Sequence, residues 1–416
     1  MHALEKILAK ASGKKQVSRG EIVTAKVDMA EVNDLYLQVI QSFHKMGATR
    51  VKCPDKVCFV LDHYAPAPTI HSAANQKAMR EFVKEQKIQH LFDINEGVCH
   101  QVMPEAGIVY PGMLLVATDS HTTTHGAFGA FGTGVGATDL ATILATGELW
   151  FRVPAIIKIK IDGTPRKGVM AKDIILYIIG KLGPSAAVYK GIEYCGSAVD
   201  QMSMSGRMVL CNMAVEMGAK TSYIQPDKKT ITYIKSKTDK KFQVFTTDLD
   251  YQYSDEYNFD ITDLTSQVAK PDHIDDVDNV SDVEPVKIDQ VFIGTCTGGR
   301  VEDIGIAAKI LSGKRVHDGT RLVVIPASKN VFLESLEKGY ITSLIKSGAT
   351  ISAPGCGPCL GAHQGVLAPG EYCVTTSSRN FPGRMGSTDA KIFCASPATA
   401  AASALEGKLS DPQKYL

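Results

Sequence analysis

The sequence predicts an α/β fold with more than one domain. Apolar, strand-like runs alternate along the chain with glycine-containing turns and helical segments, which is the pattern of α/β proteins. The 416 residues provide room for two to three domains of ordinary size. Hydrophobic residues make up 44% of the chain and charged residues 21%, and this balance is typical of a globular protein.

The expected elements follow one another in strand–helix order. We expect a strand at 51–61, a helix at 69–87, and a buried strand that begins at 113 and runs out into polar residues near 121. The units that follow are a helix at 137–148, a half-buried strand at 155–161, a helix at 173–182 and a strand at 291–294. Composition shifts between about 225 and 290, and a new strand opens at 291, so we place candidate boundaries near 154 and 282 and predict three α/β units at 1–154, 155–281 and 282–416.

The middle of the chain has an uneven charge distribution. Residues 228–241 are basic and β-like, whereas residues 248–290 hold thirteen acidic residues against Lys270 and Lys287. We interpret these stretches as a surface hairpin followed by an extended, solvated connector. A docking surface for a partner is the alternative interpretation.

Charge and hydropathy argue against several classes of protein. Forty-five basic and 44 acidic residues give a formal charge of +1, so binding to nucleic acid by bulk electrostatics is disfavoured. The first twenty residues lack the apolar core of a secretory signal, and no apolar run is long enough to span a bilayer. We therefore expect a cytoplasmic protein whose ten cysteines are reduced.

Two glycine-rich loops carry cysteines that follow apolar runs. GTCTGGR contains Cys296, and APGCGPCLG contains Cys356 and Cys359. These residues could form a structural zinc site with His363, a redox pair in the CGPC motif, or an iron-sulfur cluster. A cluster held by only three thiolates would leave one iron free to act as a Lewis acid. The redox interpretation is weakened because CGPC lies late in the chain, not early in a domain.

Acidic residues and histidines follow two of the expected strands. Asp62-His63 follows the run CFVL, and Asp119-Ser120-His121 follows LLVAT. The carboxyl ends of strands are where α/β sheets bind ligands, and histidine suits proton transfer near neutral pH. His100, in GVCHQ, is a third candidate. In SSRNFPGR, two loop arginines, Arg379 and Arg384, indicate an anionic ligand with carboxylate groups.

Six motifs together resemble the aconitase and isopropylmalate isomerase superfamily along nearly the whole chain. They are DHYAP (62–66), GVCHQ (97–101), ATDSHTTTHGAFG (117–129), GTCTGGRVED (294–303), GCGPCLG (355–361) and RNFPGR (379–384). The resemblance is closest to the large subunits of two-chain hydro-lyases. It implies dehydration and rehydration of a 2-hydroxy dicarboxylate, with 3-isopropylmalate in leucine biosynthesis favoured and homoaconitase or 2,3-dimethylmalate dehydratase chemistry as alternatives.

The resemblance also implies an architecture and a partner. Family members place three α/β/α domains around the cluster and add a fourth, swivelling domain, for which this chain has no room after residue 384. We therefore expect a separate small subunit that carries the fourth domain, and no membrane partner. A thiol-disulfide oxidoreductase and a cluster-free RNA-binding protein are more distant alternatives.

Roles for individual residues follow from the same resemblance. Cys296, Cys356 and Cys359 would ligate a 4Fe-4S cluster, one per chain, whose fourth iron binds the substrate hydroxyl and carboxylate. Asp62 and His63 would protonate the departing hydroxyl. The remaining implied positions are His100, Asp119, His121 and Glu193 around the iron-bound water, Asn33, Ser120 and Arg379 on the substrate, and Arg384 on a substrate carboxylate or the cluster loop. The sequence has Ser378 where relatives usually have asparagine, so no contact is carried over to it.

Overall fold

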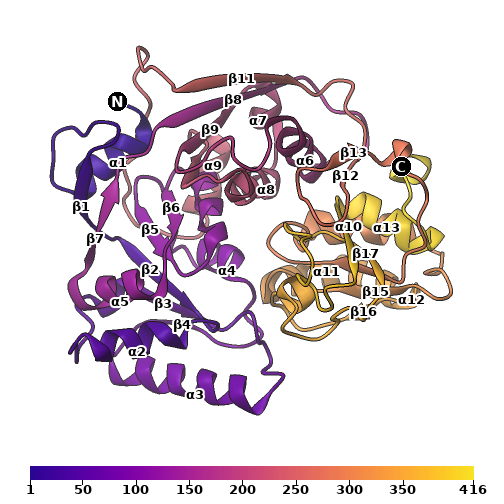
Figure 1. The fold of residues 1–416 in the computed structure, drawn as a ribbon, viewed down its shortest axis with the longest axis horizontal. Coiled ribbons are helices and arrows are strands. Elements are labelled where there is room, and N and C mark those ends of the chain that lie inside the picture. Colours follow the sequence, from indigo (N-terminus) through magenta and orange to yellow (C-terminus); the bar gives the residue numbers. More distant parts are fainter.

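Three largely parallel sheets organise the computed structural model, which describes all 416 residues (Figure 1). The first sheet is parallel, and its strands in spatial order are β4 (His90–Phe92), β3 (Val57–Val60), β2 (Met29–Asn33), β5 (Leu114–Ala117) and β6 (Phe131–Gly134). The parallel strands are connected by helices, as such sheets require. The predicted α/β fold class is confirmed.

Helices cover the first sheet and bury its apolar residues. They are α1 (Ala3–Ala11), α2 (Leu37–Lys45), α3 (Ile70–Glu85), α4 (Cys99–Glu105) and α5 (Ala137–Thr146). Helix α3 begins at Thr69, whose Oγ1 accepts a hydrogen bond from the Ser72 N–H at 3.1 Å. A short antiparallel pair, β1 (Ile22–Lys26) and β7 (Glu148–Arg152), lies at the edge of this unit.

The second sheet is also parallel and has four strands. In spatial order they are β10 (Thr221–Tyr223), β9 (Gly191–Cys195), β8 (Ile156–Asp162) and β11 (Asp255–Asp260). The associated helices are α6 (Ala171–Leu182), α7 (Ser197–Gln201), α8 (Met204–Met213) and α9 (Lys228–Lys235), with the 3₁₀ turn η3 (Ala214–Met217) after α8. The apolar residues of this unit pack with residues of the first unit, Leu115 and Phe128 among them, in the largest buried cluster of the molecule.

Two expectations for the middle of the chain are wrong. Residues 228–235 form helix α9 and not a hairpin strand, because Asp227 caps its N-terminus and Thr230 and Ile234, four residues apart, are both buried. The acidic segment 248–290 is not simply a solvated connector. It contributes β11 to the second sheet and two strands to the third.

The third sheet has seven strands and carries the C-terminal part of the chain. Its order is β13 (Val277–Asn279), β12 (Gln267–Ala269), β18 (Lys391–Ala395), β17 (Tyr372–Thr375), β14 (Gln290–Ile293), β15 (Arg321–Val324) and β16 (Thr350–Ile351). Its helices are α10 (Val301–Leu311), α11 (Lys329–Glu337), α12 (Tyr340–Lys346) and α13 (Pro397–Glu406). Because β12 and β13 precede residue 282 and pair into this sheet, we place the last boundary upstream of 282; the three-domain division itself remains a prediction.

Short 3₁₀ turns occur mainly at strand ends and near loops. They are η1 (Pro54–Lys56), η2 (Ser120–Phe128), η4 (Val280–Asp282), η5 (Gly357–Leu360) and η6 (Pro412–Tyr415). Two of them, η2 and η5, carry residues of the predicted site. The structure contains no helix with the length and apolarity needed to cross a membrane.

Candidate active site

The predicted site residues lie on loops that leave the carboxyl ends of parallel strands. Asp62 follows β3, Asp119 follows β5, Cys296 follows β14 and Ser378 follows β17. In a parallel sheet, all such loops emerge at the same end of the strands. Loops from the first and third sheets meet directly, since the Cys356 N–H donates a hydrogen bond of 2.8 Å to the Asp62 carbonyl oxygen.

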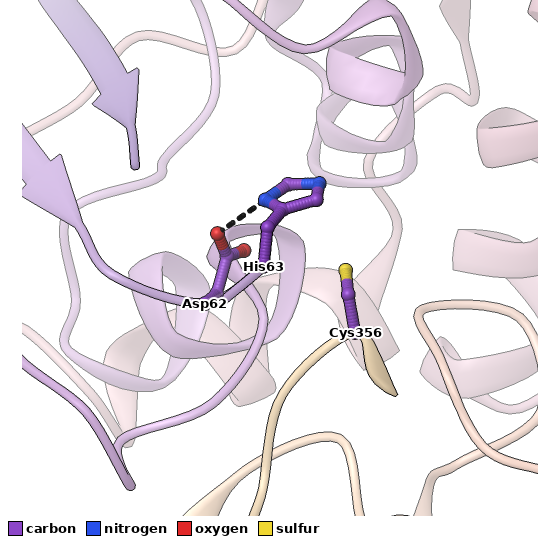
Figure 2. Close-up of side chains that lie close together, drawn as sticks. All are labelled: Asp62, His63 and Cys356. Carbon is purple, nitrogen blue, oxygen red and sulfur yellow. Dashed lines mark hydrogen bonds and ion pairs between the residues drawn. The ribbon is translucent and has the colours of Figure 1, made fainter. Parts of the chain in front are cut away.

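The three cysteines converge on one buried cavity. Cys296, Cys356 and Cys359 line it together with the side chains of Asp62, His63, His100, Asp119, His121, Ser378 and Arg384. Figure 2 shows the Cys356 sulfur and the His63 ring rising from different loops on the same side of Asp62. Glycine is required beside Cys356, because a Cβ at Gly355 would lie 2.8 Å from the Asp62 carbonyl oxygen and Gly357 has a φ of +58°.

Asp62 and His63 form a buried hydrogen-bonded pair. The His63 Nδ1 lies 2.7 Å from Asp62 Oδ1, and the second carboxylate oxygen accepts a hydrogen bond of 2.8 Å from the Cys99 N–H. Asp34 holds the loop by accepting hydrogen bonds from the backbone N–H groups of His63 and Tyr64, both at 2.9 Å. Although burial opposes the imidazolium, Cys356 and Asp62 raise the pKa of His63 well above its usual value.

Asp119 lies among three histidines. Its Oδ1 is 3.2 Å from His100 Nε2 and accepts a hydrogen bond of 2.7 Å from the His121 N–H, and its Oδ2 is 3.7 Å from His63 Nε2. Burial alone would raise the pKa of this carboxyl, but His100 and His121 outweigh burial and hold it well below the usual value. Asp119 is therefore a carboxylate that can accept hydrogen bonds at neutral pH.

Glu193 is not part of this cluster, which corrects the role we predicted for it. It points from β9 toward the N-terminal segment, where its Oε2 lies 2.5 Å from His2 Nε2 and accepts a hydrogen bond of 2.9 Å from the Tyr253 hydroxyl. Glu193 lines neither cavity described for the site. The glutamate that the structure brings to the site lies in AVEMGAK, not in GIEYCG.

Glu216 occupies the position expected for Glu193. Its Oε1 lies 2.8 Å from His121 Nε2 and accepts a hydrogen bond of 2.8 Å from Arg379 Nε. Burial opposes ionisation, but His121 and Arg379 hold the pKa of Glu216 below its usual value. No motif in the sequence marks this residue, because its partners lie 95 and 163 positions away.

A larger pocket of about 550 Å³ adjoins the cysteine cavity. His63, Asp119 and His121 line both spaces, and the pocket adds Ser120 and Arg379. Arg379 Nη2 donates a hydrogen bond of 3.0 Å to Ser120 Oγ, so the serine and the arginine face the same space. This pocket can accept a small anionic molecule beside the histidines.

Two other residues are placed less simply. Asn33 is buried on β2, where its Oδ1 accepts a hydrogen bond of 3.2 Å from the Leu35 N–H and its Nδ2 has no partner, and it does not line the pocket. Ser378 lines the cysteine cavity, and its Oγ lies 2.9 Å from His121 Nε2. The resemblance carried no contact over to Ser378, yet the structure brings it to the site.

The donor set fits an iron-sulfur cluster better than either alternative. Asn212 Nδ2 donates a hydrogen bond of 3.2 Å to Cys296 Sγ, and Arg384 Nη2 donates one of 3.6 Å to Cys359 Sγ, as expected around cluster thiolates. His363 does not line the cavity, because its Nε2 bonds the Pro66 carbonyl oxygen at 2.7 Å, so a zinc site that includes it is disfavoured. Burial raises the pKa of Cys356, which is the opposite of what a reactive CGPC thiol needs.

The chain belongs to the aconitase family. The family model described as "Aconitase family (aconitate hydratase)" matches residues 5–407, and the predicted family is thereby confirmed. The chain is 51% identical over 413 residues to the 3-isopropylmalate dehydratase large subunit 1 of Methanopyrus kandleri, covering 99% of both chains. It is 47% identical over 419 residues to a probable methanogen homoaconitase large subunit of Methanothermobacter thermautotrophicus, covering 100% of this chain and 98% of the relative. A 3-isopropylmalate dehydratase large subunit of Hydrogenobaculum sp. is 46% identical over 411 residues, with 99% and 97% covered.

Proposed function

We propose that this chain is the cluster-binding large subunit of a hydro-lyase that interconverts 2- and 3-isopropylmalate in leucine biosynthesis. The observation that carries the proposal is the convergence of three cysteine thiols, the Asp62–His63 pair and Asp119 on one buried cavity. The full-length similarity to enzymes named 3-isopropylmalate dehydratase supports the choice of substrate. We also propose that the protein works in the cytoplasm, where thiols stay reduced.

Cys296, Cys356 and Cys359 would hold a 4Fe-4S cluster at the cavity. When bound, this cluster supplies a Lewis acid that makes the substrate hydroxyl a better leaving group. The hydrogen bonds to the sulfurs of Cys296 and Cys359 would stabilise the thiolates.

His63 is the proposed acid for the departing hydroxyl. Its raised pKa favours a proton on the ring, and Asp62 orients the ring through Nδ1. The Nε2 atom is therefore free to deliver its proton into the cavity shared with the substrate pocket. The water formed from the departing hydroxyl would be oriented by hydrogen bonds to His100, Asp119 and His121. Glu216 would hold the His121 ring in place.

Arg379 and Ser120 would bind a carboxylate of the substrate. Glu216 holds the Arg379 guanidinium by its Nε, which leaves the far edge of the group, beside Ser120 Oγ, directed at the pocket. Arg384 lines both spaces and donates to Cys359, so it would join the cluster loop to the substrate carboxylate. Asn33, without access to the pocket, would support this region from β2.

A small subunit would complete the site. The relatives are named large subunits, so we take the base that removes the substrate proton to lie on a separate small chain. We propose that the partner carries the swivelling domain and supplies this base. Nucleic acid is not a proposed partner, because the net charge is +1.

A homoaconitase activity is the second candidate. Probable methanogen homoaconitase large subunits are 47% and 50% identical to the chain. Lys220 lines the substrate pocket and donates a hydrogen bond of 3.2 Å to the Gly134 carbonyl oxygen, so it adds a cation to the pocket lining. Homocitrate carries one more carboxylate than isopropylmalate, and Lys220 could bind it.

The test is an assay of the two-chain enzyme. The chain would be purified anaerobically with the small subunit encoded by the same genome, and dehydration of isopropylmalate, homocitrate and 2,3-dimethylmalate would be measured in parallel. We expect the highest kcat/KM for isopropylmalate and no turnover by the large subunit alone. Higher kcat/KM for homocitrate would establish the second candidate, and activity of the chain without its partner would contradict the proposed division of the site.

A further inference from the structure

A lysine is buried beside the cysteine loops without an acidic partner. Lys172, on α6, is 1% exposed, and its Nζ donates hydrogen bonds to Ser377 O at 2.6 Å, Thr376 O at 3.0 Å and Thr297 Oγ1 at 3.3 Å. No carboxylate oxygen lies within 4.0 Å of this ammonium group, whereas the buried Arg207 pairs with Asp227. Burying a cation in this way is costly unless an anion nearby compensates it.

The acceptors of Lys172 belong to the two loops that lead to the site. Thr297 directly follows Cys296, and Ser377 directly precedes Ser378. Because Lys172 comes from a helix of the second unit, one side chain connects that unit to both loops of the third sheet. Burial lowers the pKa of Lys172, and the thiols of Cys394, Cys296 and Cys359 act against burial.

Arg300, four residues after Cys296, is a second buried cation without a carboxylate partner. Arg300 is 2% exposed. Its Nε donates a hydrogen bond of 2.9 Å to Gln101 Oε1, and neither Nη1 nor Nη2 has a partner. The carboxyl group of Asp303 accepts a hydrogen bond from the Arg300 backbone N–H. Burial raises the pKa of Asp303 to about 7. One buried cation, Lys172, therefore contacts the Cys296 loop and another, Arg300, belongs to it, and neither has a carboxylate partner.

We propose that Lys172 is a positioning residue that fixes the two site loops and serves as a buried counter-charge to the thiolate-ligated cluster. The inference rests on the proposed cluster. A cluster ligated by three thiolates carries net negative charge, which supplies the anion that the protein around Lys172 lacks. Nearby positive charge favours the reduced, more negative state of a cluster, so Lys172 raises its reduction potential and protects it from oxidative loss.

Lys172→Met tests the counter-charge because it keeps an unbranched side chain as far as Cε and removes the ammonium group. The full chain would be reconstituted anaerobically with iron and sulfide, and the midpoint potential would be followed by electron paramagnetic resonance. We expect a more negative potential than in the wild type and a several-fold faster loss of visible absorbance in air. Lys172→Arg, which keeps the charge, should retain a potential close to that of the wild type.

Arg207→Met is the matched control, since it removes a buried cation that is neutralised by Asp227 and does not line the cysteine cavity. It should lower the urea midpoint of unfolding without shifting the potential. Urea unfolding of the cluster-free proteins would check that each variant is folded. A variant that folds without the cluster but does not retain the cluster after reconstitution supports the proposal. If the Met variant does not fold, Lys172→Gln replaces it.

The outcomes separate the two proposals. An unchanged potential and unchanged stability in air for a loaded Lys172→Met or Lys172→Gln protein would overturn the role of Lys172 and leave the proposed function intact. A wild-type chain that takes up no iron and sulfide under these conditions would overturn the cluster itself, and the inference about Lys172 with it.

Discussion

His63 and Asp62 are neighbours in sequence whose side chains meet at 2.7 Å through Nδ1 and Oδ1. The contact leaves the other ring nitrogen of His63 directed toward Asp119, 3.7 Å away. A protonated imidazole between two carboxylates is a poised acid, and it lies where the cysteine cavity meets the substrate pocket. The chemistry we propose depends on this pair.

Replacing His63 should remove the acid and leave the cluster in place. We expect His63→Gln to lower kcat of the two-chain enzyme by about 10²- to 10⁴-fold, the usual contribution of a general acid. The measurement is kcat per assembled cluster, with iron and sulfide content determined on the same sample. His71→Gln, at an exposed position on α3, is the control and should retain full activity. Equal activity of the two variants would show that the proton comes from elsewhere.

Replacing a proposed ligand should remove the cluster and leave the fold. We expect Cys359→Ser to abolish a stable cluster, because a serine oxygen is a much poorer ligand for iron-sulfur clusters than a thiolate. Iron, labile sulfide and visible absorbance of the anaerobic protein measure the loss, and circular dichroism checks the fold. Cys53→Ser, outside the cavity, should load normally. Full iron and sulfide in Cys359→Ser would contradict the ligand assignment.

The two glutamates should behave differently when each is replaced by glutamine. Glu216→Gln weakens the hydrogen bonds to His121 and Arg379, so we expect kcat/KM to fall about 100-fold, which corresponds to about 2.7 kcal/mol. Glu193→Gln should leave kcat/KM near the wild-type value but lower the midpoint of unfolding, since its partners are His2 and Tyr253. The opposite result would restore the role that the resemblance implied for Glu193.

A buried carboxyl should make stability depend on pH. Burial raises the pKa of Asp173 to about 7, so the folded chain holds this proton more tightly than the unfolded chain does. The stabilisation of the folded chain by this bound proton is complete below about pH 4 and is lost as pH rises to about 7. The free energy of unfolding falls by at most about 1.4 kcal/mol per pH unit over this range. Urea unfolding of the cluster-free chain from pH 5 to 8 measures it.

Asp173→Asn cannot titrate, so the free energy of unfolding of this variant relative to the wild type should rise between pH 5 and 7 and level off above. Asp318→Asn, at an exposed position, is the control and should show a constant difference from the wild type. A pH-independent difference for Asp173→Asn would mean that the carboxyl is ionised in the folded chain throughout this range.

Much of the fold could be predicted because its signals are local. The expected helix at 69–87 is α3 (Ile70–Glu85), and the expected strand at 291–294 is β14 (Gln290–Ile293), since apolar spacing and a capping residue such as Thr69 lie within the segment itself. Helix α9 differs from the expected strand because its β-branched residues suggest a strand, while the cap at Asp227 and the packing of Ile234 favour a helix. Strand β11 was missed because its exposed acidic residues conceal the pairing with β8.

The sequence by itself determined the family, the α/β class and the local motifs that carry the cysteines and the Asp-His pairs, because each motif is a short run of residues whose chemistry does not depend on distant parts of the chain. Only the tertiary structure decided which distant groups join them. Glu216 replaces Glu193 at His121, Ser378 enters the cavity, and the buried Lys172 contacts Thr297, next to Cys296. These contacts form between different sheets, so they depend on how the sheets pack and not on any local pattern.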